Sequence, residues 1–503
     1  MIKITIENTP LVGTMGFLKD MISSYQKKFE NVKSSDESIW NIWMSRRNQK
    51  MNVYKNLLVA GLIFFVPAVS NGQRDKLLTL DESITIALHK NYSIKSAEYT
   101  LQQRDAQVLS AYSLILPRVN VSSGKSRFLQ GATSNIGNVQ GVDDNGNPTI
   151  VSQVFTSPYF QQDNHSFGLT INQNIYDGGG WWNSIAQAKS FQTSGFHALE
   201  SAKNDAVFLI TQQYLQLSKA TALQYALFDA LMLSQEQLER TKSLYELGSV
   251  ARTDLFKARV QLGNDKSNLL MQQNVVAAAK SSLNLAMGRD PLTPIRLEEK
   301  EYTNVEYPSR EEAIDIAKKN SPRIKQFEAA VSGAKHGKKV AKAAFYPSLS
   351  ANIQYSRSNQ DLGSVFNPSN ISNNWQSNLG VSLSLNIFNG FADKANLEQS
   401  QAIYNSSRED LENSNRDLIA RIDDAITKLE TYEELESIFE ENLQSATEDL
   451  RLATERYGLG SATLLEVQDA QVALLRANTS VIRNKYDSQI AYAQLMNTMG
   501  QIR

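Results

Sequence analysis

The chain repeats itself at a fixed spacing, and this internal duplication constrains its architecture more than any other feature. Two stretches share Tyr, Leu, Gly, Ser, an acidic residue, Ala and Val at matching positions: Tyr245-Glu-Leu-Gly248-Ser-Val-Ala-Arg-Thr-Asp254-Leu-Phe-Lys-Ala258-Arg-Val260 and Tyr457-Gly-Leu-Gly460-Ser-Ala-Thr-Leu-Leu-Glu466-Val-Gln-Asp-Ala470-Gln-Val472. Their offset in residue number is 457 − 245 = 212, and the same offset separates Ile175-Tyr-Asp-Gly178 from Ile387-Phe-Asn-Gly390. Such a repeat indicates one structural unit built twice. We therefore expect one elongated body with two similar halves, although 503 residues would ordinarily suggest two or three compact domains.

Charge and composition exclude several classes of protein. The 51 basic and 52 acidic residues nearly cancel, so the chain has no electrostatic footprint for nucleic acid. It has no cysteine, which excludes disulfides, thiolate metal sites and a lipidated N-terminal cysteine. The histidines lack the spacing of a metal site: His89, His165, His197 and His336. We find no nucleophile–base pair or phosphate-binding loop, so we predict no catalysis, no metal and no cofactor.

One stretch, Leu57–Val69, is strongly apolar, and its length and position are typical of a secretory signal. A short basic region beginning at Met51 precedes it, and small residues follow it. The stretch is too short for a spanning helix, which needs about 20 residues. A buried core helix is the alternative. We expect a signal peptide at 51–72, a misassigned upstream extension at 1–50 and a mature chain from about Gln73.

Alternating apolar and polar residues predict strands beyond two prolines, Pro117 and Pro347, which end the helices before them. In the second half the apolar positions are Leu349, Ala351, Ile353 and Tyr355, then Leu379, Val381, Leu383, Leu385 and Ile387. This period of two indicates one apolar and one polar face, and it places strands at about 118–130, 166–176, 348–358 and 377–388. A soluble sheet is one interpretation. Small polar inner positions in an exported chain favour a lipid-embedded barrel with a wet interior.

The first strand hairpin is longer than the second, because the offset between the halves is 230 at the prolines and only 212 at the return strands. The inserted segment includes Gln140–Pro148, which is rich in polar groups and turn formers. We expect a large external loop here that tolerates substitution.

Long helices follow the strand hairpins. Apolar residues recur every seventh position, as in a coiled coil, at Tyr404, Leu411, Leu418, Ala425, Tyr432, Phe439, Ala446 and Ala453. We expect long helices at about 180–244 and 391–456, each about 100 Å long at 1.5 Å per residue. Shorter helices return from them and end at two Met-Gly pairs with the same offset, Met287-Gly288 and Met499-Gly500. The two repeats then occupy 73–290 and 309–503, joined by a crossover at 291–308.

Four strands and paired long helices, duplicated behind a signal peptide, resemble the TolC-type outer-membrane efflux protein family. The resemblance covers about residues 78–500, and its most specific parts are Asp81-Glu-Ser-Ile-Thr-Ile-Ala87, Glu311-Glu-Ala-Ile-Asp-Ile-Ala317, Asn386-Ile-Phe-Asn-Gly390 and the two Tyr-x-x-Gly turns. It implies a mainly α fold with a β-barrel portion. Three copies would form one 12-stranded outer-membrane β-barrel and a periplasmic α-helical barrel. Physics also favours cyclic association of several copies, because four strands cannot close a barrel and about eight is the minimum.

The resemblance also assigns roles to the two helical turns. In the family these turns close the inner end of the tunnel and meet a periplasmic adaptor protein, which connects to an inner-membrane pump. The matching gate residues are Glu466, Asp469, Tyr457, Thr253 and Asp254. The matching adaptor-docking positions are Leu247, Gly248, Ser249, Leu459, Gly460 and Ser461. Three copies of each second-turn carboxylate would form two acidic rings, which favour cations.

A purely structural interpretation of these turns stays open. Acidic residues stabilise the first turn of any helix, and glycine commonly ends one. One position departs from the family pattern, since Ala462 stands where an arginine is expected. Either Arg252 or Arg456 takes that role, or the gate is held less tightly.

We therefore predict a non-catalytic exit duct in the outer membrane that extends into the periplasm and serves a tripartite efflux or type I secretion system. Its partners would be two further copies of itself, an adaptor, a pump and outer-membrane lipid, with no nucleic acid. The sequence leaves open whether the cargo is small molecules or protein. A periplasm-spanning scaffold or adhesin without a pore is one alternative, and the paired strands argue against it. A passive porin is another, and the long helices argue against that.

Overall fold

A computed structural model describes residues 77–298, 306–367 and 375–502 of the chain. They belong to one compact unit, Asp75–Arg503. The expected upstream extension at 1–50 and signal peptide at 51–72 lie outside the described residues, as does part of the crossover.

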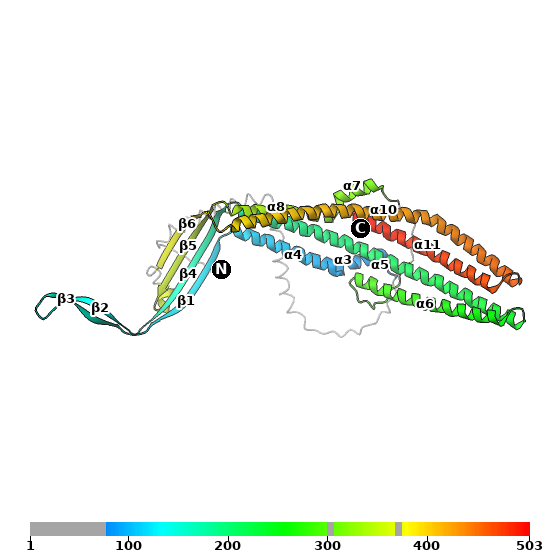
Figure 1. Cartoon of the computed structure of the whole chain (residues 1–503), viewed down its shortest axis with the longest axis horizontal. Coiled ribbons are helices and arrows are strands. Elements are labelled where there is room, and N and C mark those ends of the chain that lie inside the picture. Colours follow the sequence, from blue (N-terminus) through cyan, green and yellow to red (C-terminus); the bar gives the residue numbers. More distant parts are fainter. Residues whose placement is uncertain (1–76, 299–305, 368–374, 503) are drawn as a thin grey trace, which may run out of the picture. The chain divides into compact units, whose positions relative to one another are not determined.

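Two helices of 67 residues and two of 35 repeat the duplication of the sequence (Figure 1). In the first half α5 spans Gly180–Glu246 and α6 spans Arg252–Ala286. In the second half α10 spans Ala392–Gly458 and α11 spans Leu464–Thr498. Both long helices continue slightly beyond the expected ends at 244 and 456. At 1.5 Å per residue each extends about 100 Å.

Shorter helices lead into the strands and pack along the long ones. They are α3 (Leu80–Lys90), α4 (Tyr92–Tyr112), α7 (Arg310–Asn320) and α8 (Pro322–Ala343), with a short α9 (Leu362–Phe366) and a 3-10 turn at Ser113–Ile115. Helix α4 packs on α5, whereas α8 packs on both α5 and α10. Side-chain hydroxyls cap α3 and α7: the Glu82 amide donates to Thr79 at 3.1 Å, and the Glu312 amide donates to Ser309 at 3.4 Å. Among the described residues, no helix combines the length and apolarity needed to cross a membrane.

Each half has its own apolar core, and the two cores use equivalent positions. Ile210, Leu217 and Met287 pack against Ala87 of α3 in the first half. Their counterparts in the second half of the duplication pack against Ala313 and Ala317 of α7: Ile422, Leu429 and Met499. Each short helix therefore docks where a long helix meets the end of its returning partner.

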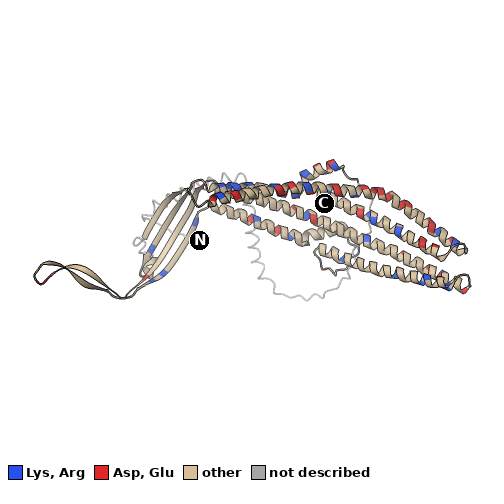
Figure 2. Cartoon of the chain, viewed as in Figure 1, with Lys and Arg blue, Asp and Glu red and all other residues tan. Residues whose placement is uncertain are grey.

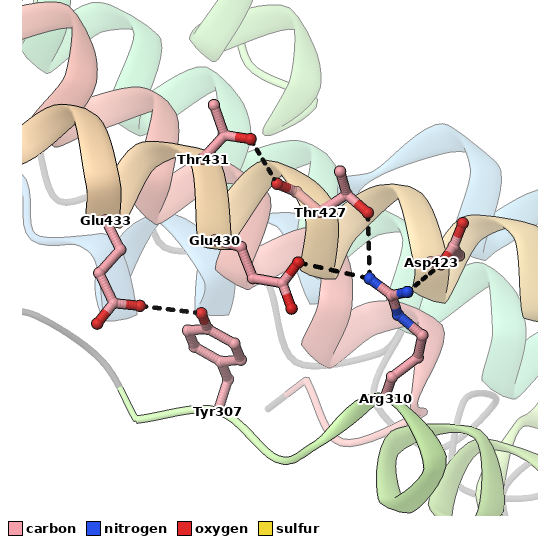
Figure 3. A network of polar contacts seen from close by, with 7 residues as sticks. All are labelled: Tyr307, Arg310, Asp423, Thr427, Glu430, Thr431 and Glu433. Atoms are coloured by element: carbon pink, nitrogen blue, oxygen red, sulfur yellow. Dashed lines mark hydrogen bonds and ion pairs between the residues drawn. The ribbon is translucent and has the colours of Figure 1, made fainter.

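Polar contacts also tie α7 to α10 (Figure 3). The guanidinium of Arg310 lies 3.1 Å from the Asp423 carboxylate, 3.3 Å from the Thr427 hydroxyl and 3.5 Å from the Glu430 carboxylate. The Tyr307 hydroxyl donates to Glu433 at 3.1 Å. These groups are half exposed, so water and salt screen them and they orient α7 more than they stabilise it.

Four antiparallel strands form the main sheet, in the order β1, β4, β5, β6. Their bounds are β1 Arg118–Gln130, β4 Phe160–Asp177, β5 Ser348–Asn359 and β6 Trp375–Ser384. The pairing of β4 with β5 joins the two halves of the duplication in one sheet. Strands β1 and β6 are left as the edges.

The register separates apolar from polar side chains. Val119, Ile171, Ile353 and Leu379 lie opposite one another in one row across all four strands. The adjacent row is Asn120, Thr170, Gln354 and Asn378. Because neighbouring positions in a strand point to opposite faces, one face of the sheet is apolar and the other polar. The apolar face is open: Val119 and Leu379, on the two edge strands, are 60% and 64% exposed.

Three features of the strands differ from expectation. Strand β4, expected at about 166–176, begins at Phe160, because its ladder with β1 continues to Gln130. The segment expected as an external loop folds into a two-stranded ribbon, β2 (Thr133–Val142) and β3 (Pro148–Ser157), which pair with each other. The return strand, expected to reach 388, ends at Ser384 because its last partner is Ser348, the first residue of β5 after the proline. Beyond that point no ladder partner remains.

Candidate functional site

The two turns between the long and returning helices share one hydrogen-bond pattern. In the first turn the Ser249 amide donates to the Leu244 carbonyl at 2.8 Å. In the second turn the Ser461 amide donates to the Arg456 carbonyl, also at 2.8 Å. Each bond closes the last helical turn on a residue two places past the helix cap, which is the Schellman arrangement. The duplication thus extends to the backbone of the turns.

A glycine with positive φ makes each turn possible. Gly248 has φ 73° and Gly460 has φ 72°, and a Cβ at either position would meet nothing within 4 Å. The glycines are therefore required by backbone conformation and not by crowding. Beside them, Leu247 is 78% and Leu459 is 84% exposed, so each turn carries an uncovered apolar side chain.

The helices after the turns begin differently. Helix α11 starts with a complete capping box: the Glu466 amide donates to the Thr463 hydroxyl at 3.3 Å, and the Thr463 amide donates to the Glu466 carboxylate at 3.0 Å. These bonds from Thr463 lower the pKa of Glu466, and the nearby Arg456 lowers it further. Helix α6 has Ala251 at the same position and no side-chain cap. The second turn is therefore held more firmly than the first.

Arg456 reaches the carboxylate that the capping box holds. Its guanidinium lies 3.5 Å from Glu466 and donates to the Ser461 carbonyl at 3.1 Å. Of the two arginines considered as substitutes at Ala462, this one contacts an acidic gate candidate. Arg252 instead lies over the ring of Phe256, 5.4 Å from its centroid.

Tyr457 connects the two halves. It is 5% exposed and packs in a cluster with Ala453, Val467 and Ala258 of α6. Its hydroxyl lies 3.5 Å from the hydroxyl of Thr241 on α5. The equivalent residue in the first half, Tyr245, is 39% exposed. One tyrosine of the repeated pair thus packs between the two halves of the chain, and the other is exposed.

The remaining gate candidates lie on exposed helix starts. Asp254 is 3.9 Å from the Lys257 ammonium, and Thr253 is exposed in the same first turn. Glu466 and Asp469 are both exposed, and their spacing of three places them on one face of α11. Among the described residues, no three His, Asp or Glu side chains are grouped to hold a metal ion.

Sequence reasoning did not single out two residues of this site, Thr241 and Thr463. The Thr-x-x-Glu spacing of Thr463 and Glu466 is a capping-box signature that the sequence contains. No pattern points to Thr241, because its partner Tyr457 is far away in the sequence and the equivalent position in the second half is Ala453.

Comparison with known proteins extends this picture. The family model described as "Outer membrane efflux protein" matches residues 84–289 and 313–501. Outer membrane protein TolC of Vibrio cholerae serotype O1 is 22% identical over 414 residues, 80% of this chain and 86% of that protein. Outer membrane efflux protein BepC of Brucella suis is 21% identical over 450 residues, 88% of this chain and 90% of that protein. Among solved structures, the Campylobacter jejuni CmeC outer membrane channel has the same fold, with a TM-score of 0.72, 19% identity and coverage of 84% and 85% of the two chains.

Proposed function

The chain belongs to the outer membrane efflux protein family, and from this membership we propose that it is the outer-membrane exit duct of a tripartite efflux or type I secretion system. The family consists of export channels and not enzymes, so the duct adds no chemistry of its own. It would receive its cargo from a periplasmic adaptor and an inner-membrane pump and release it outside the cell.

The two-faced sheet is the observation that carries this proposal. A sheet with an exposed apolar face, a polar face and two unpaired edges is unstable alone in water. Three copies would join each β6 to the β1 of the next copy and close a 12-stranded barrel, apolar outside and polar within. Closure removes every edge and turns the exposed Val119 and Leu379 toward lipid.

The helices would continue the duct into the periplasm. Three copies supply six helices of 67 residues, and each extends about 100 Å. Exposed apolar residues along them, such as Tyr225 and Ile438, would pack between copies. The repeats at 73–290 and 309–503 would contribute equivalent parts to this tunnel, with the crossover at 291–308 joining them. A signal peptide at 51–72 and an upstream extension at 1–50 would precede the mature duct.

The turns would form the gate at the inner end. Glu466 and Asp469 would form two acidic rings, with Thr253 and Asp254 on the facing turn and Tyr457 tying the halves together. Arg456 would neutralise part of the Glu466 charge in the resting state. The exposed turn segments Leu247–Ser249 and Leu459–Ser461 would dock the adaptor.

Electron microscopy of the mature protein extracted in detergent would test the duct. We expect a threefold particle with a short barrel and a hollow helical extension of about 100 Å. A monomer, or a solid rod without a barrel, would contradict the proposal and favour the scaffold. The relatives do not support that alternative, since they are named as outer membrane and efflux proteins.

A further inference from the structure

Three lysines form a row on α8, near its junction with the sheet. Lys335, Lys339 and Lys342 are spaced by four and three positions, so they share one face of the helix, and all three are exposed. No ion pair to any of them occurs among the described residues. The chain has no acidic residue from 329 to 360, so no near neighbour in sequence offsets their charge. Figure 2 shows basic residues gathered where α8 approaches the sheet.

A cavity between three helices shows which side of α8 the row occupies. The cavity has a volume of about 330 Å³ and is lined from α5, α8 and α10 together, by residues that include Phe191, Gly337, Lys338 and Ile403. Because one cavity is lined by both α5 and α10, these two neighbours of α8 approach each other on that side, and we infer that it is the concave side of the three helices. The row residues do not line it.

Helix geometry agrees with this placement. His336 bonds Asn183 of α5 at 3.1 Å, and a Cβ at Gly337 would contact Gln187 of α5, so these positions face α5. Successive residues of an α-helix are rotated by about 100° around its axis. Around the axis of α8 the three lysines therefore lie about 60–120° from His336, in the direction opposite to Gly337. In a closed tube the concave side is the lumen. The lysine row is therefore on the outer surface.

The row also lies at a particular depth. Helix α8 ends at Ala343, and β5 begins at Ser348. From its first lysine to its last, the row covers about 10 Å of helix. Exposed aromatic side chains lie between the row and the strand or at the start of α5: Phe345, Tyr346 and Trp182. Going from the sheet toward α8, an apolar face is thus followed by aromatic residues and then by cations, which is the order found across a membrane–water interface.

The duplication provides an internal control for these lysines. When the two halves are aligned on Pro117 and Pro347, the equivalent positions of α4 are Asp105, Leu109 and Tyr112. Helix α4 packs on α5 without any lysine there, and Asp105 accepts a hydrogen bond from Gln192 at 2.9 Å. The equivalent pair in the second half is α8 and α10. The lysines are therefore not needed to fold this type of helix or to dock it on its long partner, which leaves their charge available for another role.

We propose that Lys335, Lys339 and Lys342 bind the phosphates of anionic phospholipids in the periplasmic leaflet of the outer membrane. This inference rests on the proposed function, because it requires the sheet to lie in that membrane. Three copies would present nine ammonium groups in three clusters around the outside of the duct. The long lysine side chains can lie along the helix and extend their ammonium groups into the headgroup region. The clusters would fix the depth and the lipid surroundings of the barrel.

The test compares the mature trimer with Lys335→Gln/Lys339→Gln/Lys342→Gln and with a matched control, Lys266→Gln/Lys318→Gln/Lys319→Gln. The control removes the same charge from exposed lysines of α6 and α7. Each protein is placed in nanodiscs of phosphatidylethanolamine with a tenth of phosphatidylglycerol or cardiolipin. Native mass spectrometry then measures the anionic lipid retained, with phosphatidylcholine as the neutral reference.

We expect the row variant to retain anionic lipid about 10- to 100-fold more weakly, with the control unchanged. Inorganic phosphate at about 50 mM should compete only weakly, since a lipid presents its phosphate at a fixed surface. Equal retention by all three proteins, or full displacement by inorganic phosphate, would overturn the inference. So would unchanged lipid retention accompanied by lost binding to peptidoglycan, which presents carboxylates. Failure of the wild-type protein to enter nanodiscs as a trimer would instead contradict the proposed function.

Discussion

Tyr457→Phe separates the contribution of the Tyr457 hydroxyl from that of its aromatic ring to the contact between the two halves. The 3.5 Å contact of the Tyr457 hydroxyl with Thr241 is long, and both groups are neutral. Its net value should lie near the low end of the range for buried hydrogen bonds, about 0.5 kcal/mol. Thr241 keeps a second partner, the side-chain amide of Gln237 at 3.3 Å, so removing the phenol oxygen leaves no buried hydroxyl unpaired. The aromatic ring, by contrast, is nearly fully buried, and Tyr457→Ala should cost about 3–5 kcal/mol.

Two measurements on the purified trimer test this division. Hydrogen exchange of the turn amides reports the free energy for separating the turns. The protection factors of these amides should fall about twofold in Tyr457→Phe. Thr241→Val should give a larger loss, because it also leaves the buried Gln237 amide without its partner. Adding Tyr457→Phe to Thr241→Val should cost nothing further, because the bond between the two hydroxyls is already gone. Tyr457→Ala should expose the turns and raise conductance in planar bilayers. If Tyr457→Phe is as severe as Tyr457→Ala, or if the losses from Tyr457→Phe and Thr241→Val add fully, the reasoning is wrong.

Three further predictions concern the turns and α8. Gly460→Val should destabilise the second turn by about 1–3 kcal/mol, because a β-branched residue is strained at positive φ, and Gly460→Ala should destabilise it less. Equal melting temperatures of the wild type and the two variants would contradict this prediction. The double substitution Glu466→Ala/Asp469→Ala should reduce the channel's preference for cations in bilayer recordings, and unchanged selectivity would contradict the proposed acidic rings. Glu466→Ala alone should also lower thermal stability, because it removes the capping box of α11. Burial lowers the pKa of His336, and the nearby Lys339 and Lys335 lower it further; burial also lowers the pKa of His197. As pH falls, both histidines therefore bind protons in the unfolded chain before they do so in the folded protein. The free energy of unfolding should consequently decrease as pH drops below about 6.5. His336→Gln should remove part of that fall in melting temperature, and a pH profile identical to wild type would refute the assignment.

The sequence predicted the architecture well where periodicity and duplication reinforce each other. Heptads and the constant offset between the halves placed the long helices, since each signal recurs many times along the chain. The insertion that includes Gln140–Pro148 was expected as a loop because it is rich in polar groups and turn formers, yet on either side of its turn residues such as Ile136 and Val154 pair across a ribbon. Backbone pairing between strands can outweigh weak local strand propensity, and a single sequence does not reveal it.

The candidate site was predictable only in part. Glycine at positive φ and acids in first helical turns are local signals, and the structure places them in matched turns. The contact between Tyr457 and Thr241 depends on packing between halves, so no local pattern encodes it. The difference between the two turns follows from one residue, threonine or alanine, at the helix cap. A resemblance to a family cannot supply such a detail of one chain.

The spacing of apolar clusters along α10 has a mechanical consequence. Its main core ends near Leu429, its tip cluster begins near Ala453, and no residue from 430 to 452 is buried. If α10 and the returning α11 tilted together, they would act as a lever arm with a pivot about 44 Å from the turn at 1.5 Å per residue. A tilt of about 5° at the pivot would carry the turn through about 4 Å, the width of a van der Waals contact. Side-chain adjustments around Arg310, at the pivot, would thus be amplified into the difference between touching and separated turns.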